Sequence, residues 1–373
     1  MRDLAILLLS STLAIGALEL GLRAFVPHSR LLDRDDDAFW KVRFQEQAAD
    51  LDLSEGRLGN GQFHPTLGWI PRPLLRRDDK GERTNSKGLR GSREFSYERP
   101  DGMRRILLLG DSFTYGYGVG DEEVYAARLA ALLPDWEILN LGVNGYGTDQ
   151  QYLYWLEEGR RYAPQVVLLG YYVADFHRNT LSFRELAKPR FVVDGDHLRL
   201  QPLRATSLEE VLEESRRVES RRLRIADAAS FLLRLTRSEP RASFEEKARL
   251  TKGILEMLRD SIRREGAELW VAVIPHGEVR EDPGARRIEE FLANVCADLG
   301  VPVIDLVDPI RAQRERSGRP LYREHHWTAE THALAAHVIV QALPVQRAAG
   351  GEPIAQHGAA SRSETSTTGA GRE

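Results

Sequence analysis

The sequence is poor in cysteine and has no excess of positive charge, and both shortages restrict what the protein can be. Cys296 is the single cysteine among 373 residues, so the fold has no internal disulfide and must rest on an apolar core. Cys296 falls on the apolar stripe of an expected helix, which places it in that core. Lys and Arg number 52 against 56 Asp and Glu, a formal net charge of −4. Nucleic-acid binding needs clustered positive charge, and we therefore expect no such partner.

Signatures of a phosphate loop and of a metal site are also missing. The glycine-rich segment NLGVNGYGTDQQ at 140–151 lacks the Gly-Lys-Ser/Thr element of a phosphate-binding loop. The segment EHHWTAETH at 324–332 holds three histidines and two glutamates, but no His-Glu-x-x-His pair and no cysteine ligand. We therefore expect no bound metal.

The N-terminus, by contrast, carries a long apolar run. No charged residue occurs from Leu4 to Leu18, which is short for a membrane-spanning helix and long for a core helix. Residues 1–27 are therefore expected to be a signal anchor or a signal peptide. We favour an anchor, because apolar residues continue to Leu22, past the small-residue pattern at 14–16. The rest of the chain is then exported or anchored in the inner membrane, with its main domain outside the cytoplasm, in the periplasm.

A regular alternation of strands and helices begins at residue 104. Short apolar runs predict five strands, at 106–110, 136–142, 165–173, 268–275 and 301–306. Helical apolar stripes separate these strands, and a last helix is expected from about 329 to 343. Strands that alternate with helices form a parallel sheet covered on both faces. The predicted class is therefore α/β.

The remaining segments are assigned by composition. Residues 28–98 form an N-terminal extension with mixed signals, and residues 99–345 the main domain. Residues 175–243 interrupt the alternation with a hairpin signal and a charged helical stretch, and we expect them to be an insertion over the domain. Residues 346–373 are rich in Gly, Ala, Ser and Thr and are expected to be disordered.

The first predicted strand ends abruptly in Gly-Asp-Ser, within RRILLLGDSFTYGYGV at 104–119. One interpretation is a turn in which Asp111 or Ser112 caps a helix. The other is a nucleophilic Ser112 at the carboxyl edge of the sheet, where open α/β folds bind their ligands. The position after the first parallel strand favours the nucleophile.

A nucleophilic serine needs a base, an orienting acid and donors for the oxyanion. His326 lies in the loop before the last helix, at the same sheet edge as Ser112. In an extended loop, residues two apart project to the same side, so the Glu324 carboxylate is expected to hold the second imidazole nitrogen of His326. His332 and His337 fall within the helix and are expected to be packing or surface residues.

Backbone donors are expected from the loop after the second strand. Gly142, Gly145 and Gly147 have no Cβ, so that their amides can approach a ligand closely. Such glycine-rich turns are common, and this segment alone is a weak signal.

Together, these three segments resemble the SGNH/GDSL hydrolase superfamily. Gly-Asp-Ser follows the first strand, Asn-x-Gly-x-x-Gly the second, and acid-x-His-Trp precedes the last helix. The resemblance covers about residues 60 to 345 and includes TNSKGLRGSREF at 84–95, which is similar to the lead-in of membrane-anchored bacterial members. It implies a flavodoxin-like three-layer α/β/α fold and a serine esterase or acyl-transfer mechanism without a cofactor.

The resemblance also implies roles for individual residues. Ser112 is the expected nucleophile, and its amide and that of Gly145 the oxyanion donors. His326 is the expected base, and Glu324 stands where the family usually has aspartate. Asp111 is expected to shape the nucleophile turn.

One block departs from the family pattern. Members carry Gly-x-Asn-Asp after the third strand, with the asparagine as an oxyanion donor, whereas this chain has Ala174 before Asp175. Loss of one such donor typically costs ~10²–10³ in turnover. Asn144 or Asn179 could take over this role.

Three functions remain open at this point. The first is an esterase that removes O-acyl groups from carbohydrate of the cell envelope. The second is the same chemistry run as O-acetyl transfer to a polysaccharide, with an acyl donor made by a membrane partner. The third is a non-catalytic binding module, for which Ala174 is the main support and the other expected site residues are the counter-argument.

Overall fold

The computed structural model describes residues 2–236, 244–275 and 283–344, and the tail expected at 346–373 lies outside these ranges. Five parallel strands form the central sheet in the order β8-β7-β9-β12-β13. Their bounds are β7 (Arg104–Gly110), β8 (Trp136–Gly142), β9 (Val166–Tyr172), β12 (Glu268–Ile274) and β13 (Val303–Asp305). All five predicted strands are present. Numbered along the chain, the order is 2-1-3-4-5, which is the flavodoxin-like arrangement.

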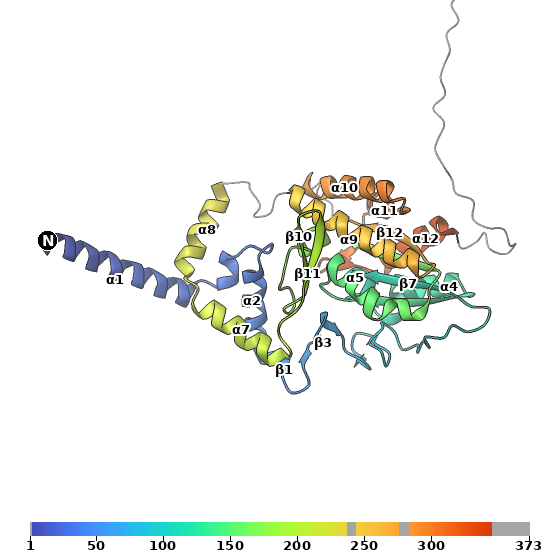
Figure 1. The fold of residues 1–373 in the computed structure, drawn as a ribbon, viewed down its shortest axis with the longest axis horizontal. Coiled ribbons are helices and arrows are strands. Elements are labelled where there is room, and N and C mark those ends of the chain that lie inside the picture. The colour runs from blue at the N-terminus through green and yellow to red at the C-terminus, as the bar shows by residue number, and fades with distance from the viewer. Residues whose placement is uncertain (1, 237–243, 276–282, 345–373) are drawn as a thin grey trace, which may run out of the picture.

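Helices cover both faces of this sheet (Figure 1). Leu107 and Leu109 of β7 face one apolar core, and Ile106 and Leu108 face the other. Side chains of α5, α9 and α10 complete the first core, and those of α4, α11 and α12 complete the second. The bounds are α4 (Tyr125–Leu132), α5 (Thr148–Glu157), α9 (Phe244–Arg264), α10 (Pro283–Leu299), α11 (Val307–Ser317) and α12 (Ala329–Ala342). Cys296 is buried in the first core, as predicted.

The N-terminal extension contains short elements that pack beside this domain. They include α2 (Asp37–Glu46), the four-stranded antiparallel sheet β1 (Leu51–Asp52), β2 (Arg57–Leu58), β3 (Gly61–His64) and β4 (Gly68–Pro71), and the pair β5 (Arg76–Arg77) and β6 (Glu82–Arg83). Single turns of 3-10 helix lie in this extension at η1 (His28–Leu31) and η2 (Ala48–Asp50). Two more lie in the main domain, at η3 (Asp121–Glu123) and η4 (Gly159–Tyr162). Leu67, Trp69, Leu89 and Phe95 enter the first core, so the extension is built onto the domain.

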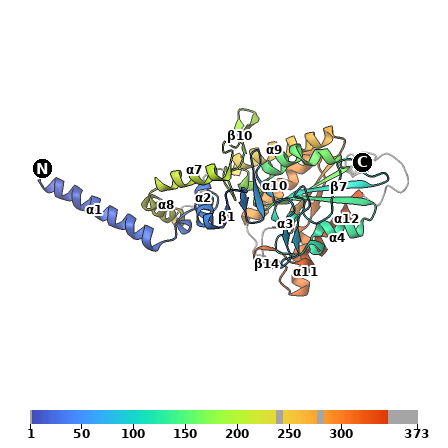
Figure 2. The same cartoon turned by 90° about the horizontal axis from the view of Figure 1, so that it is seen from below.

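The inserted residues divide between two places. The predicted hairpin forms from β10 (Arg190–Asp194) and β11 (His197–Gln201) and packs against α9. We expected the charged helical stretch to lie over the domain as well. Instead α7 (Leu208–Ser220) packs against α2, and α8 (Arg224–Thr236) packs against α1 (Arg2–Phe25), away from the sheet (Figures 1 and 2). Leu208, Val211 and Leu212 of α7 join the first core, whereas α8 contacts α1 and η1.

A row of three glycines brings a short helix onto the ends of the central strands. Gly110, Gly142 and Gly170 pair in register across β7, β8 and β9. A Cβ on Gly142 would lie 2.3 Å from the backbone nitrogen of Tyr115. On Gly110 or Gly170 it would lie 2.0 or 2.5 Å from Thr114 Oγ1. The absence of side chains thus allows α3 (Ser112–Tyr115) to rest directly on the sheet edge.

Gly142→Ala is expected to destabilise the fold by ~1–3 kcal/mol or more, because the new methyl group meets backbone atoms of α3 that have nowhere to move. Denaturant unfolding of purified protein measures this change in the free energy of unfolding. Gly120→Ala is the matched control, since a Cβ there has its nearest neighbour at an ordinary 3.5 Å. Equal stability of the two variants would contradict the close fit of α3.

Candidate active site

Ser112 lies at the first residue of α3, directly after β7. Asp111 precedes it, and its Oδ1 accepts a hydrogen bond from the Phe113 N–H at 2.9 Å. The carboxylate of Asp111 therefore caps the short helix and shapes the turn. The Ser112 hydroxyl remains available for another partner, although the residue is only 6% exposed.

That partner is His326, which is 214 positions away in sequence. The Ser112 Oγ lies 2.8 Å from His326 Nε2. His326 begins β15 (His326–Trp327), which pairs with β14 (Tyr322–Arg323) in a hairpin with a two-residue loop. The loop residues Glu324 and His325 have φ of +48° and +68°. Positive φ at both positions is typical of the type I′ turn, which fits the twist of a tight hairpin.

The imidazole of His326 is held between aromatic rings. Phe113 of α3 lies 5.4 Å from it and Tyr117 4.7 Å, measured between ring centroids. Burial in this setting lowers the pKa of His326 from its ordinary value of 6.5, and the positive charge of Arg178 acts in the same direction. The negative charge of Asp111 opposes them. A neutral imidazole can accept the serine proton, so this shift keeps the base ready below neutral pH.

The acid limb of kcat/KM for ester hydrolysis is therefore expected to have its midpoint below pH 6.5. The sign follows from the lowered pKa, since His326 stays neutral until the pH falls below that shifted value and only then loses its function as a base. The rate of p-nitrophenyl acetate hydrolysis across the acidic range gives the midpoint. A midpoint above 6.5 would contradict the arrangement.

The Glu324 side chain does not make the contact expected of it. His326 Nδ1 lies 3.2 Å from the backbone oxygen of Glu324, and the side chain of Glu324 is exposed. Our expectation assumed an extended loop, whereas the positive φ of Glu324 turns the backbone so that its carbonyl faces the ring. The carbonyl accepts a hydrogen bond from the Nδ1–H of His326. Nε2 is then the nitrogen that accepts from the serine hydroxyl. The carboxylate of Asp305, the last residue of β13, accepts from the N–H of Val307, the first residue of α11, at 2.7 Å.

Glu324→Gln is accordingly expected to change turnover of p-nitrophenyl acetate by less than about threefold, because the backbone carbonyl remains and an exposed charge contributes little. A second variant, Glu324→Asn with His325→Gly, places at the turn the residues that tolerate positive φ best and should raise thermal stability with activity kept. A large loss of turnover in Glu324→Gln would restore the carboxylate as the orienting acid.

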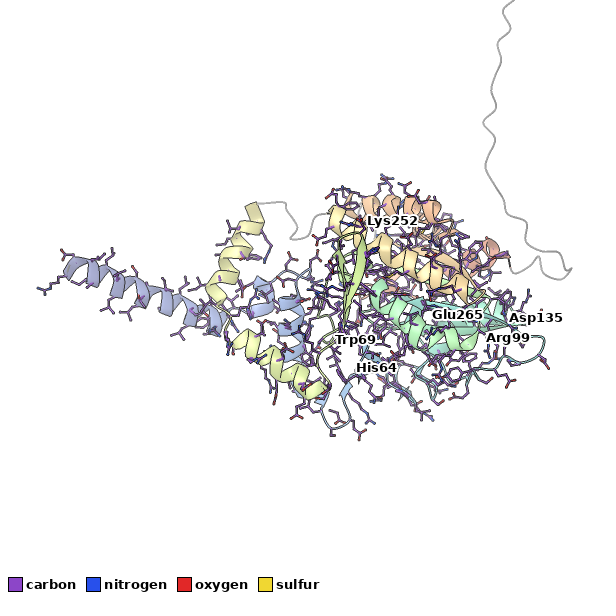
Figure 3. All side chains as sticks on the ribbon, in the orientation of Figure 1. His64, Trp69, Arg99, Asp135, Lys252 and Glu265 are labelled. Atoms are coloured by element: carbon purple, nitrogen blue, oxygen red, sulfur yellow. The ribbon has the colours of Figure 1, made fainter. Side chains whose placement is uncertain are left out.

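The loop after β8 brings Gly145, whose φ is +79°, to the same edge of the sheet. Two bonds to Trp69, labelled in Figure 3, hold this loop: the indole Nε1–H donates to the Asn144 carbonyl at 2.9 Å, and the Tyr146 hydroxyl donates to the Trp69 carbonyl. Trp69 belongs to the N-terminal extension, and the sequence offered no signal for this role. The side-chain oxygen of Asn144 is buried and has no hydrogen-bond partner among the described residues.

Arg178 connects the three loops that meet at the site. Its Nη1 lies 2.7 Å from Asp111 Oδ2, 3.0 Å from Asp175 Oδ1 and 3.0 Å from the Tyr146 carbonyl. Asp111 follows β7, Tyr146 follows β8, and Asp175 begins α6 (Asp175–Arg178) after β9. Burial alone would lower the pKa of Arg178, but Asp111 and Asp175 raise it above its usual value. Arg178 therefore stays charged and joins the loops electrostatically.

The block around Ala174 is arranged differently from the family pattern. Ala174 precedes α6, and Arg178 follows it by one helical turn, a spacing that could have identified the arginine in the sequence. Asp175 is fully buried, and this burial raises its pKa well above the ordinary value. Asn179 is directed elsewhere, since its Nδ2 donates to Thr251 Oγ1 at 3.2 Å and its Oδ1 accepts from the Asp149 N–H. Asn144 and Asn179 were both considered as replacements for the oxyanion donor that is absent at Ala174. The side chain of Asn179 is already engaged by these two hydrogen bonds.

The two other histidines of the last segment lie where they were expected. His332 is buried in α12, its Nδ1 accepts from the Tyr125 N–H at 3.3 Å, and burial lowers its pKa to about 3. His337 is exposed and contacts the Ala333 carbonyl.

A cavity of about 530 Å³ adjoins the loop after β9, and neither Ser112 nor His326 lines it. It borders the site through Tyr172, Ala174 and Arg178, and the Tyr172 ring lies 4.8 Å from that of Phe113. Aromatic and cationic side chains line much of the rest: Trp40, Phe244, Arg34, Arg184, Lys247 and Arg287. An apolar wall with a few placed donors is typical of a small-molecule or carbohydrate site.

A family model described as the GDSL-like Lipase/Acylhydrolase family matches residues 108–334. No curated protein matches the sequence significantly.

Solved structures with a similar fold are distant in sequence. One is a catalytic mutant of the acetylxylan esterase Axe2 from Geobacillus stearothermophilus, at 12% identity and a TM-score of 0.40, covering 65% of this chain and 95% of that one. A second belongs to the lipolytic protein G-D-S-L family of Veillonella parvula, at 13% identity and a TM-score of 0.38, covering 64% and 97%. A third is a GDSL-like lipase from Bacteroides thetaiotaomicron, at 11% identity and a TM-score of 0.39, covering 66% and 89%.

Proposed function

This chain belongs to the GDSL-like lipase/acylhydrolase family and is a hydrolase of ester bonds, and from this premise we propose that it removes O-acyl groups from carbohydrate of the cell envelope with Ser112 as nucleophile. The observation that carries the catalytic part is the 2.8 Å contact between Ser112 Oγ and His326 Nε2. Nucleophile and base are then within hydrogen-bond reach, as serine catalysis requires.

The first half-reaction transfers the acyl group to the enzyme. Ser112 Oγ attacks the acyl carbonyl while His326 Nε2 takes the proton of the serine hydroxyl. The Glu324 carbonyl accepts a hydrogen bond from the Nδ1–H of the resulting imidazolium. The amides of Ser112 and Gly145 are the proposed donors to the oxyanion of the tetrahedral intermediate. When this intermediate collapses, the sugar oxygen leaves with the proton from His326, and an acyl-serine remains.

The second half-reaction releases the acyl group. His326 takes a proton from water, the hydroxide formed attacks the acyl-serine, and Ser112 leaves as its hydroxyl with that proton. If a sugar hydroxyl replaces the water, the same steps perform O-acetyl transfer to a polysaccharide, which is the alternative function. Transfer needs an acyl donor, and a membrane partner would have to provide it.

The cavity at the loop after β9 supports a carbohydrate substrate. Arg184 and Arg287 lie over the rings of Trp40 and Phe244, at 3.3 and 3.7 Å from the ring centroids, and these guanidinium groups are possible donors for hydroxyl or carboxyl oxygens. Burial lowers the pKa of Arg184 to about 10, which leaves it charged at neutral pH. Because Ala174 and Arg178 line the same cavity, a sugar bound there could present its acyl group to Ser112.

The apolar helix α1 supports a location at the membrane. It is long and apolar enough to cross a bilayer, and none of its described residues is buried. We propose that α1 is an uncleaved anchor and that residues 99–345, the hydrolase domain, lie outside the cytoplasm. A mature N-terminus near residue 17, found by intact mass of the exported protein, would show a cleaved signal instead.

Acetate release tests the function directly. The full chain in detergent is expected to release acetate from p-nitrophenyl acetate and from an O-acetylated polysaccharide, and Ser112→Ala is the inactive control. Acetyl groups appearing on an added polysaccharide at the expense of free acetate would favour the transferase. A complete lack of turnover with every ester would favour the non-catalytic binding module.

A further inference from the structure

Helix α8 lies across the end of α1, at the place where the chain enters the folded domain. In Figure 1 α8 runs steeply across the axis of α1, and in Figure 2 the two again meet at the C-terminal end of α1. The Glu19 carboxylate of α1 accepts hydrogen bonds from the N–H groups of Arg224 and Ile225 at 3.1 and 2.9 Å. The first turn of α8 is thus joined to the last turns of α1.

The polar side chains of α8 point inward, toward the N-terminal segment. Asp227 is buried and its Oδ2 lies 2.7 Å from His28 Nε2. Arg234 donates to the Leu31 carbonyl at 2.6 Å, and Arg224 donates to the carbonyls of Leu22, Arg23 and Val26. The described charged side chains of α8 are therefore all engaged by α1 and by η1.

The outward face of α8 is apolar. Ala226 and Ala229 are exposed there, and Leu232 and Leu235 are 62% and 69% exposed. A helix on the surface of a soluble domain normally has the opposite arrangement, with its apolar stripe turned to the core. Each leucine left in water forgoes the favourable free energy of burial, so this face fits an apolar environment.

The position of this face identifies the environment. Because η1 contacts one side of α8, the exposed leucines lie on the side away from η1. Figure 1 shows α1 extending from its meeting point with α8 away from the folded domain. If α1 crosses a bilayer, α8 then lies along the bilayer surface at the point where α1 leaves it.

We infer that α8 is an interfacial helix, which inserts Leu232 and Leu235 into the bilayer that α1 spans. This inference rests on the proposed role of α1 as an anchor. Arg216, Arg217 and Arg221 are exposed at the adjoining end of α7, where lipid phosphates are within reach of a helix at this depth. Basic residues near an anionic lipid surface are attracted to it.

Fluorescence quenching tests the position of α8 in the full chain. The protein is reconstituted into vesicles of phosphatidylethanolamine and phosphatidylglycerol, with an environment-sensitive dye on Leu232→Cys. Cys296 is buried, and burial raises the pKa of its thiol to about 12, so it does not compete for the label. Leu200→Cys on the β10–β11 hairpin is the matched control, since Leu200 is 39% exposed and lies far from α1 in Figure 1.

The dye at position 232 is expected to lose most of its emission to nitroxide-labelled lipid and little to aqueous iodide, with the reverse at position 200. Equal access of iodide to both positions would overturn the inference. Protection of position 232 from both quenchers would overturn it too, because a protein partner or a second copy would then cover the face.

A charged variant separates this inference from the proposed function. Leu232→Glu with Leu235→Glu is expected to lose lipid contact, read by a dye on Ala229→Cys, and to hydrolyse p-nitrophenyl acetate at the unchanged rate. Ser112→Ala is expected to keep the lipid contact and to lose hydrolysis. Lipid contact that persists in the charged variant would contradict the role of the two leucines, whatever the outcome for activity.

Discussion

Ser112→Ala is expected to lower turnover of p-nitrophenyl acetate by roughly 10⁴- to 10⁶-fold, because the variant lacks the nucleophile. The hydroxyl is the only group at the end of β7 that lies within hydrogen-bond distance of His326 among the described residues. Removal of one oxygen from a side chain on a short helix leaves the core untouched, so the unfolding midpoint should not change. Burst and steady-state kinetics measure the loss.

His326→Ala is expected to lower turnover by as large a factor as Ser112→Ala does. The double variant should lower turnover no further than either single variant, because nucleophile and base act as a unit. His325→Ala is the matched control. His325 is the neighbouring residue and is exposed, and the hydroxyl of Ser112 contacts His326 instead. If His325→Ala were inactive and His326→Ala active, the assignment of the base would be wrong by one position.

Arg178→Met is expected to reduce turnover by about 10²-fold, since loss of the link between three loops misplaces groups that must be aligned within a fraction of an ångström. It also leaves the carboxylates of Asp111 and Asp175 without their cation. Both are fully buried, and an unpaired buried charge costs ~3–5 kcal/mol of stability.

A pH profile distinguishes this positioning role from a purely structural one. The charge of Arg178 lowers the pKa of His326, so its removal should move the acid limb of kcat/KM to higher pH. Arg287→Met is the control, because Arg287 lines the same cavity, is 60% exposed, and pairs with Glu245 rather than with Asp111. A stability loss in Arg178→Met with an unshifted pH profile would assign Arg178 to the fold alone.

Local patterns were sufficient for the main elements of the domain. The run ILLLG predicts β7 because four fully buried aliphatic residues in succession fit a strand covered on both faces. The Gly-Asp-Ser that follows could be placed at the sheet edge because parallel strands all end on one side. The order of the segments around Ser112, Gly145 and His326 was enough to identify the family resemblance.

Contacts across the chain could not be predicted in the same way. The Glu324 carbonyl replaced the expected carboxylate because the turn adopts positive φ, a conformation that neither Glu nor His prefers and that the hairpin imposes. Trp69 stood in a segment without a motif, and Arg178 stood one helical turn after the block that departs from the family pattern. Their roles depend on which loop lies opposite, and strand order and the N-terminal extension decide that.

The sequence by itself therefore determined the layered sheet, the nucleophile turn, the histidine and the apolar helix at the N-terminus. Each of these depends on residues close together in the chain, where periodicity and turn chemistry are readable. Only the tertiary structure decided which group orients His326, what holds the three loops together and that α8 turns its leucines outward. The group that orients His326 is set by the backbone of a tight turn. The other two features arise where separate segments of the chain meet, and the free energy of packing selects among partners that the sequence lists without ranking.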